Sequence, residues 1–127
     1  YPLRRQRQMC IRDRLKAVLD ESFATLTDGC DGVFLSVDID VVDPGMAPGT
    51  GTPEPGGMTS RELLEAVRRI CLELPVVGID VVEVAPAFDS ADITAILANR
   101  VVLEALSAIA KRRNGTTYNP TQNLLDR

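Results

Sequence analysis

Two aspartates that lie two residues apart, Asp38 and Asp40, are the residues of this chain best placed for chemistry. They stand where an apolar run that begins at Gly32 gives way to a loop rich in glycine and proline. In an extended segment, residues two apart point to the same side, so the two carboxylates should project together. Adjacent carboxylates repel each other unless a cation or a shared proton intervenes. Because carboxylate oxygens suit Mg, Ca or Mn, the pair predicts a divalent-metal site.

The same pair of aspartates has a plainer explanation. Aspartate accepts turn hydrogen bonds, so one of the two could cap the loop while the other is solvated. The residues alone leave both interpretations open. Asp43, which precedes Pro44, is interpreted as a structural turn residue, and Thr52 offers one hydroxyl in the same loop.

A third carboxylate, Glu83, lies near the end of a second apolar run, VVGIDVVEV. A glutamate in so apolar a run is rarely buried unless it is paired. A salt bridge to a neighbouring arginine is therefore one interpretation of Glu83. Asp80 lies three residues earlier, so in a strand it points to the opposite side.

The apolar pattern predicts five regular elements that alternate along the chain. Short Val-rich runs bounded by turn residues predict buried strands, and apolar stripes of helical period predict helices. The elements are a helix at 15–26, a strand at 32–38, a helix with N-cap Thr59 and capping-box partner Glu62, a strand at 76–84, and a helix capped by Asp89 or Ser90 that ends at 113. This order predicts an α/β fold with parallel strands joined by crossovers.

The apolar residues of the last predicted helix form a stripe that we expect to face the core and to be buried. The stripe consists of Ile93, Ile96, Leu97, Val101, Leu106 and Ile109.

Length and charge divide the chain into three parts. At 127 residues it fits one domain. Residues 1–14 hold five arginines and one aspartate, within a chain whose net charge is −4. We expect residues 1–14 to be a basic leader that is either disordered or foreign to the rest, residues 15–113 to be the folded part, and residues 114–127 to be a tail.

Composition also excludes several classes of function. The chain contains no histidine, so none of its three cysteines can form a Cys/His catalytic pair within it. The odd cysteine count suits the cytoplasm. The basic leader lacks aromatic interleaving, so we expect no nucleic-acid partner. We find no uninterrupted apolar run of about 18 residues and expect no membrane partner.

Several motifs resemble the signature of the ureohydrolase family, which includes arginases and agmatinases. They are Ser36-Val37-Asp38-Ile39-Asp40, Asp43-Pro44, the stretch from Ala47 to Pro53, and the stretch from Gly78 to Pro86. The resemblance extends to about Ala110 and is most like the C-terminal half of an agmatinase. It implies a three-layer αβα fold with a mainly parallel sheet, of which only the C-terminal part is present here.

The resemblance also implies roles for four residues. Asp38 and Asp40 would bind a two-manganese centre, Thr52 would lie beside the substrate guanidinium, and Glu83 would hold that guanidinium. The implied chemistry is metal-assisted hydrolysis, in which an activated water attacks the guanidinium carbon. Asp80 would then be a supporting residue.

The resemblance predicts hydrolysis of agmatine to putrescine and urea, a step of polyamine biosynthesis. Guanidinobutyrate or another guanidino acid is the alternative substrate, and a non-catalytic assembly or regulatory domain is the alternative function. The family's GGDH and DAHxD motifs are absent, so about two of six expected metal ligands are present and we expect no activity from this chain alone. The family also implies a homo-oligomer, a trimer or hexamer, in the full-length protein.

Overall fold

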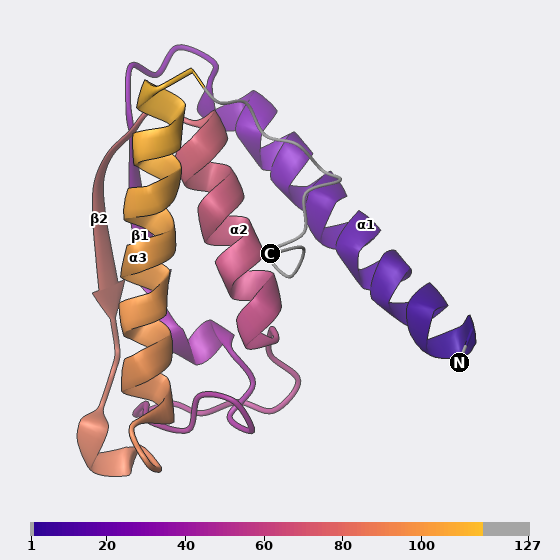
Figure 1. Cartoon of the computed structure of the whole chain (residues 1–127), viewed down its shortest axis with the longest axis vertical. Helices are drawn as coiled ribbons and strands as arrows, with labels where there is room; N and C mark the ends of the chain where they lie inside the picture. Colours follow the sequence, from indigo (N-terminus) through magenta and orange to yellow (C-terminus); the bar gives the residue numbers. More distant parts are fainter. Residues whose placement is uncertain (1, 116–127) are drawn as a thin grey trace. The chain divides into compact units, whose positions relative to one another are not determined.

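The structure, a computed structural model, describes residues 2–115, with side chains from residue 14 onward. The chain divides into two compact units between residues 31 and 32, and each is described by itself. The first unit contains the helix α1 (Pro2–Leu26). The second contains, in chain order, the elements β1 (Val33–Asp38), the 3₁₀ turn η1 (Ile39–Val41), α2 (Ser60–Glu73), β2 (Val76–Val82), the 3₁₀ turn η2 (Pro86–Phe88) and α3 (Ile93–Arg113), as labelled in Figure 1.

The helix of the first unit is longer than predicted. It begins at Pro2, so residues 2–14 are helical where their composition led us to expect disorder. Its end agrees with the prediction, because the hydroxyl of Thr27 donates to the carbonyl of Phe23 at 2.8 Å and Gly29 adopts a left-handed φ of 74°. The division into leader, folded part and tail stays a prediction, and residues 116–127 of the tail lie outside the described part of the chain.

The two strands pair in parallel, as predicted. Phe34 is paired with Gly78 and Asp38 with Val82, after an irregularity in register between Val33 and Phe34. The ring of Phe34 lies only 2.8 Å from where a Cβ on Gly78 would be, so this position in β2 accepts glycine alone without rearrangement. Parallel pairing brings the carboxyl ends of both strands to the same edge of the sheet.

The capping box predicted for α2 is present. The backbone N–H of Glu62 donates to the Thr59 hydroxyl at 3.2 Å, and the N–H of Thr59 donates to the Glu62 carboxylate at 2.7 Å. The helix buries its apolar stripe and ends at Glu73, two residues before Pro75. The fully buried side chains of the second unit include Ile39, Val42, Val67, Cys71, Leu74, Thr94 and Val101.

The face that α3 buries differs from the predicted stripe. Leu97 and Val101 are buried, but Ile96 and Leu106 are 62% and 57% exposed. The buried face continues instead through Glu104, Ala105 and Ala108. The apolar residues of α3 lie on most sides of the helix, so their spacing alone does not show which side is buried. The small alanines let a neighbouring element approach closely, and their side is the buried one.

The helices α2 and α3 lie side by side, and α3 also packs on β2 (Figure 1). This is the predicted α/β arrangement with parallel strands. By length and composition α3 would also suffice to cross a membrane, a finding that the sequence analysis did not anticipate. Because the helix packs on α2 and carries a buried charged residue, we interpret it as a core helix.

That buried charged residue, Glu104, joins α2 to α3. Its side chain is 3% exposed. One carboxylate oxygen accepts hydrogen bonds from Arg68 on α2 at 2.9 and 2.6 Å, and the other accepts one from Arg100, one turn earlier on α3, at 2.6 Å. Two guanidinium groups thus compensate the desolvated carboxylate, which would otherwise be costly to bury.

Replacing Glu104 by Gln should therefore destabilise the protein. We expect a loss of about 2 kcal/mol, below the roughly 3–5 kcal/mol typical of broken buried pairs because Arg68 and Arg100 can turn toward solvent. The free energy of unfolding in urea measures the change. Asp20→Asn, which breaks the exposed Lys16–Asp20 pair within α1, is the control and should cost no more than about 0.5 kcal/mol. Equal losses in the two variants would contradict this account of Glu104.

Candidate active site

The strand β1 ends at Asp38, and the next three residues form the turn η1. Ile39 is fully buried. The prediction that Asp38 and Asp40 share one side of an extended strand is wrong because Asp40 lies in the turn η1. The Asp38 carboxylate caps this turn by accepting the N–H of Asp40 at 3.2 Å.

The second aspartate is tied to the long loop that follows. The Thr52 hydroxyl donates to Oδ2 of Asp40 at 2.6 Å, across twelve residues of sequence. Within the described part of the chain, neither Oδ2 of Asp38 nor Oδ1 of Asp40 has a hydrogen-bond partner. One oxygen of each aspartate is thus available to a ligand, while the other fixes the side chain in place.

The loop between η1 and α2 is ordered by Asp43. One of its carboxylate oxygens accepts the N–H of Gly45 at 2.8 Å, and the other accepts the N–H of Gly56 at 2.9 Å. The backbone N–H of Asp43 also donates to the carbonyl of Met58 at 2.9 Å, which closes the loop at its base. The interpretation of Asp43 as a structural turn residue is confirmed.

These bonds have an electrostatic consequence for Asp43. The hydrogen bond from Gly56, followed by that from Gly45, holds the pKa of the Asp43 carboxyl below its usual value, against a smaller opposing effect of burial. Both N–H donors favour the charged form of the carboxylate, so the loop is at its most stable when Asp43 is ionised.

Glu83 lies directly beyond the last residue of β2. Its backbone has a left-handed φ of 64°, an uncommon conformation for a residue with a side chain. The side chain is exposed. Within the described residues its carboxylate makes no hydrogen bond or ion pair, so the salt bridge considered from sequence is not formed there. The turn at Glu83 ends the strand two residues earlier than predicted and directs the chain away from the sheet.

The sheet brings Asp38 and Glu83 to one edge. Asp38 pairs in register with Val82, the residue before Glu83. Asp80 pairs with Ser36, further back along the strands, and its side chain is exposed. The edge therefore gathers the turn with Asp38 and Asp40, the loop with Thr52, and Glu83.

The donor atoms at this edge suit a hard divalent cation, because both free oxygens belong to carboxylates. Two protein oxygens are too few to complete the coordination of such an ion. Over the described residues, no group of three or more histidine, cysteine, aspartate or glutamate side chains is arranged to hold a metal. The aspartates thus fit a metal as one part of a ligand set.

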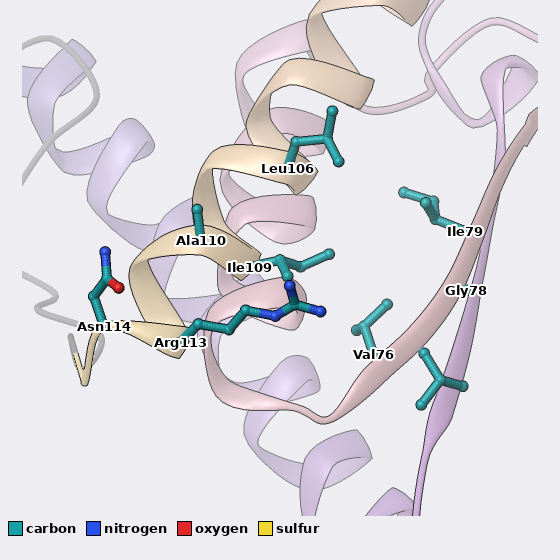
Figure 2. Close-up of a pocket in the computed structure, with 9 residues that line it drawn as sticks. Val76, Gly78, Ile79, Leu106, Ile109, Ala110, Arg113 and Asn114 are labelled. Carbon is teal, nitrogen blue, oxygen red and sulfur yellow. The ribbon is translucent and has the colours of Figure 1, made fainter.

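A pocket of about 480 Å³ lies at the opposite end of β2 and is a different feature. Figure 2 shows that Val76, Ile79, Leu106, Ile109 and Arg113 surround it, where the start of β2 faces the end of α3. Its lining is largely apolar and holds none of the predicted site residues.

The buried cysteine Cys71 offers no alternative nucleophile. Burial raises the pKa of the Cys71 thiol to about 11, although the charge of Arg112 acts in the other direction. A thiol with so high a pKa stays protonated and inert at neutral pH. Cys30 is exposed, and Cys10 lies outside the described side chains.

Sequence reasoning did not anticipate the residues that hold these loops together. Thr94 and Gly49 are buried and hydrogen-bonded to each other at 2.8 Å, although they are 45 residues apart. Thr94 lies among the apolar residues of α3, and no local pattern marks it. The presence of Asp89 as a helix cap was predicted, and its carboxylate does accept the N–H groups of Thr94 and Ala95.

Comparison with known proteins identifies the family of this chain. Residues 5–108 match the model of the arginase family, so the chain belongs to that family. The match begins at residue 5 and so includes most of residues 1–14, the predicted basic leader.

Individual relatives include several enzymes. The chain is 54% identical over 79 residues to a proclavaminate amidinohydrolase from Streptomyces clavuligerus, a match that covers 62% of this chain and 25% of that protein. It is 51% identical over 81 residues to an agmatinase from Cronobacter sakazakii, covering 64% and 26% of the two chains. The structure of formimidoylglutamase from Bacillus subtilis superposes with a TM-score of 0.70 at 41% identity, covering 73% and 29%. The chain thus spans about a quarter to a third of the length of these relatives.

The hydrogen bonds of Asp43 predict a pH-dependent stability. A carboxyl whose pKa is lower in the folded state stabilises that state fully above its unfolded value of 3.8, and the contribution is lost as the pH falls through the folded pKa. Asp43→Asn should therefore be less stable than the parent at pH 7, with a difference that shrinks below pH 3.8. Urea unfolding across this range measures it. Asp28→Asn, in the first unit, is the control, and a constant difference between parent and Asp43→Asn would refute the linkage.

Because the backbone of Glu83 is left-handed, replacing its side chain by that of glycine should stabilise the protein. Glu83→Gly should raise the free energy of unfolding by roughly 0.5–1 kcal/mol, because glycine adopts this conformation without a steric penalty. Asp80→Gly, within β2, is the matched control and should lower stability by a similar amount. Thermal and urea unfolding give both values. Destabilisation by Glu83→Gly would show that the conformation carries no strain.

Proposed function

We propose that this chain supplies part of the active centre of a manganese-dependent ureohydrolase, with agmatine as the substrate and putrescine and urea as the products. The hydrogen bond between Thr52 and Asp40 is the observation that carries the proposal. This bond joins Thr52, which we assign to substrate binding, to Asp40, which we assign to metal binding. Asp38 and Glu83 lie at the same edge of the sheet. Open α/β sheets bind ligands at this edge.

Each carboxylate has a separate task in the proposed site. Asp38 and Asp40 hold metal through the oxygens that the η1 turn and Thr52 leave free. When bound, two manganese ions supply an activated water at neutral pH. Glu83 presents an exposed carboxylate whose two oxygens can accept the parallel N–H groups of a guanidinium, which fixes the orientation of the substrate. The Thr52 hydroxyl keeps Asp40 in one rotamer beside that substrate.

The proposed site is incomplete within this chain. The sequence contains no histidine, and two aspartates offer too few ligands for two metal ions. We therefore expect no appreciable hydrolysis by this chain alone. The remaining ligands would come from polypeptide equivalent to the part of the relatives that this chain does not match.

The substrate is the least constrained part of the proposal. The relatives bear the names agmatinase, proclavaminate amidinohydrolase and formimidoylglutamase, so the family accommodates several groups beyond the reacting carbon. Glu83 and Thr52 would recognise only the guanidinium that agmatine and guanidinobutyrate share. Guanidinobutyrate or another guanidino acid is accordingly the second candidate substrate. We place the complete protein in the cytoplasm as a homo-oligomer, a trimer or a hexamer.

A non-catalytic assembly or regulatory domain is the second candidate function. The small number of metal ligands favours it. Glu83 opposes it, because an exposed carboxylate on a strained backbone is a conformation that typically persists at functional sites.

Reconstitution separates the two functions. The chain would be mixed with the part of the Cronobacter sakazakii agmatinase that it does not match, in the presence of Mn²⁺, and urea release from agmatine, arginine and guanidinobutyrate would be measured. We expect urea from the mixture with agmatine and none from either component alone. Asp40→Asn should lower the rate by at least about a hundredfold and weaken manganese binding, because a metal ligand is lost.

The matched control is Asp31→Asn, an exposed aspartate outside the site, which should leave the rate unchanged. Urea release by the isolated chain would refute the proposal that its active site is incomplete. A mixture that binds to form a stable complex but hydrolyses none of the three compounds would favour the non-catalytic alternative.

A further inference from the structure

Two loops that carry proposed substrate-binding residues meet at one glycine. The backbone N–H of Ala85, two residues after Glu83, donates to the carbonyl of Gly49 at 2.8 Å. Gly49 lies three residues before Thr52 in the loop between η1 and α2. The positions of Thr52 and Glu83 are therefore connected through a single backbone hydrogen bond.

Gly49 is in turn held by the start of α3. Its N–H donates to the Thr94 hydroxyl at 2.8 Å, and Thr94 is fully buried. The Thr94 hydroxyl thus binds a backbone donor that lies 45 residues away in sequence. Both backbone hydrogen-bonding groups of Gly49 are thus satisfied by residues of other segments.

Asp89 fixes Thr94 from a second direction. Its carboxylate accepts the N–H of Thr94 at 3.0 Å and the N–H of Ala95 at 3.0 Å, which caps α3 in place of the formal N-cap residue Asp92. The Asp89 side chain also lies 2.7 Å from where a Cβ on Gly49 would be. The contact leaves no room for a side chain on the loop, so Gly49 is confined as well as hydrogen-bonded.

We propose that Asp89 and Thr94 are positioning residues that hold Gly49 against Ala85 and so set the location of Thr52 relative to Glu83. The inference rests on the proposed function for its consequence in catalysis, since neither residue touches substrate. Its structural part, the connection of the two loops through Gly49, stands independently. A network that joins a buried hydroxyl, two backbone N–H groups and a half-buried carboxylate is well suited to fix one geometry.

The test replaces Thr94 by Val, which keeps the shape of the side chain and removes the hydroxyl. Amide hydrogen exchange is measured by NMR on the full chain. We expect the Gly49 and Ala85 amides to exchange at least about tenfold faster while the α2 amide of Leu63 is unchanged, since local opening need not involve the whole fold. The Thr52 and Glu83 amide signals should shift, and Thr94→Ser, which restores the hydroxyl, should return exchange and shifts to parent values.

Two further variants keep the test decisive. Gly49→Ala places a methyl group against Asp89 and should reproduce the effect of Thr94→Val from the opposite loop. Thr59→Val removes a different structural hydroxyl, the cap of α2, and should accelerate exchange at the start of α2 but not at Gly49. The proposal would be overturned if exchange at Gly49 and Ala85 were unchanged in both Thr94→Val and Gly49→Ala. Uniform acceleration of all amides would also overturn it, as would failure of Thr94→Ser to restore the parent values.

A kinetic measurement on the reconstituted mixture addresses the catalytic consequence. Thr94→Val should raise KM for the guanidino substrate by about tenfold with a smaller change in kcat, because displaced Thr52 and Glu83 weaken substrate binding. An unchanged KM in an active mixture would overturn the positioning role. If the parent mixture hydrolyses nothing, the proposed function fails, and the exchange data still decide whether Gly49 joins the two loops.

Discussion

Parallel pairing of β1 and β2 is the constraint on which the remainder of the second unit depends. Parallel strands cannot be joined by a short hairpin, so the chain must travel from the carboxyl end of one strand back to the amino end of the next. Here that connection consists of the loop at 42–58 and α2. The residues at the two carboxyl ends consequently share an edge with the loop that leaves the first strand. The location of the candidate site follows from this topology before any side chain is considered.

The order of the site loops comes mainly from carboxylates that accept backbone N–H groups. Asp38, Asp43 and Asp89 each do so, in η1, in the loop at 42–58 and at the start of α3. The N–H groups of such loops lack the regular backbone acceptors of a helix or sheet. Charged carboxylates accept hydrogen bonds from them instead. Asp43 and Asp89 use both carboxylate oxygens to order the backbone, whereas Asp38 orders the backbone with one oxygen and leaves the other free. Asp40 also leaves one oxygen free, and the Glu83 carboxylate is exposed.

The sequence was sufficient where a feature depends on neighbouring residues. The capping box of α2, the strand ends near Asp38 and the turn role of Asp43 are all local, and each agrees with the structure. The class of fold followed from the order of these elements. Family resemblance assigned the roles of the site residues, and those roles stay predictions.

Features that depend on tertiary packing were not predictable in this way. The extended strand predicted to carry both Asp38 and Asp40 ends at Asp38, because the backbone enters the turn η1 at Ile39. The face of α3 was misassigned because small alanines and the ion pair of Glu104, rather than the largest apolar side chains, lie at the packed surface. The left-handed backbone of Glu83 and the contact between Gly49 and Thr94 have no signature in the surrounding residues.

The fully buried Ile39 limits which substitutions the candidate site can tolerate. It separates two exposed or half-buried aspartates and carries no reactive group, yet its side chain anchors the turn on which both carboxylates depend. A change in its volume alters core packing and the spacing of the carboxylates together. The stability of the core and the geometry of the candidate site thus depend on the same side chain, so few substitutions at Ile39 would preserve both without compensating changes elsewhere in the core.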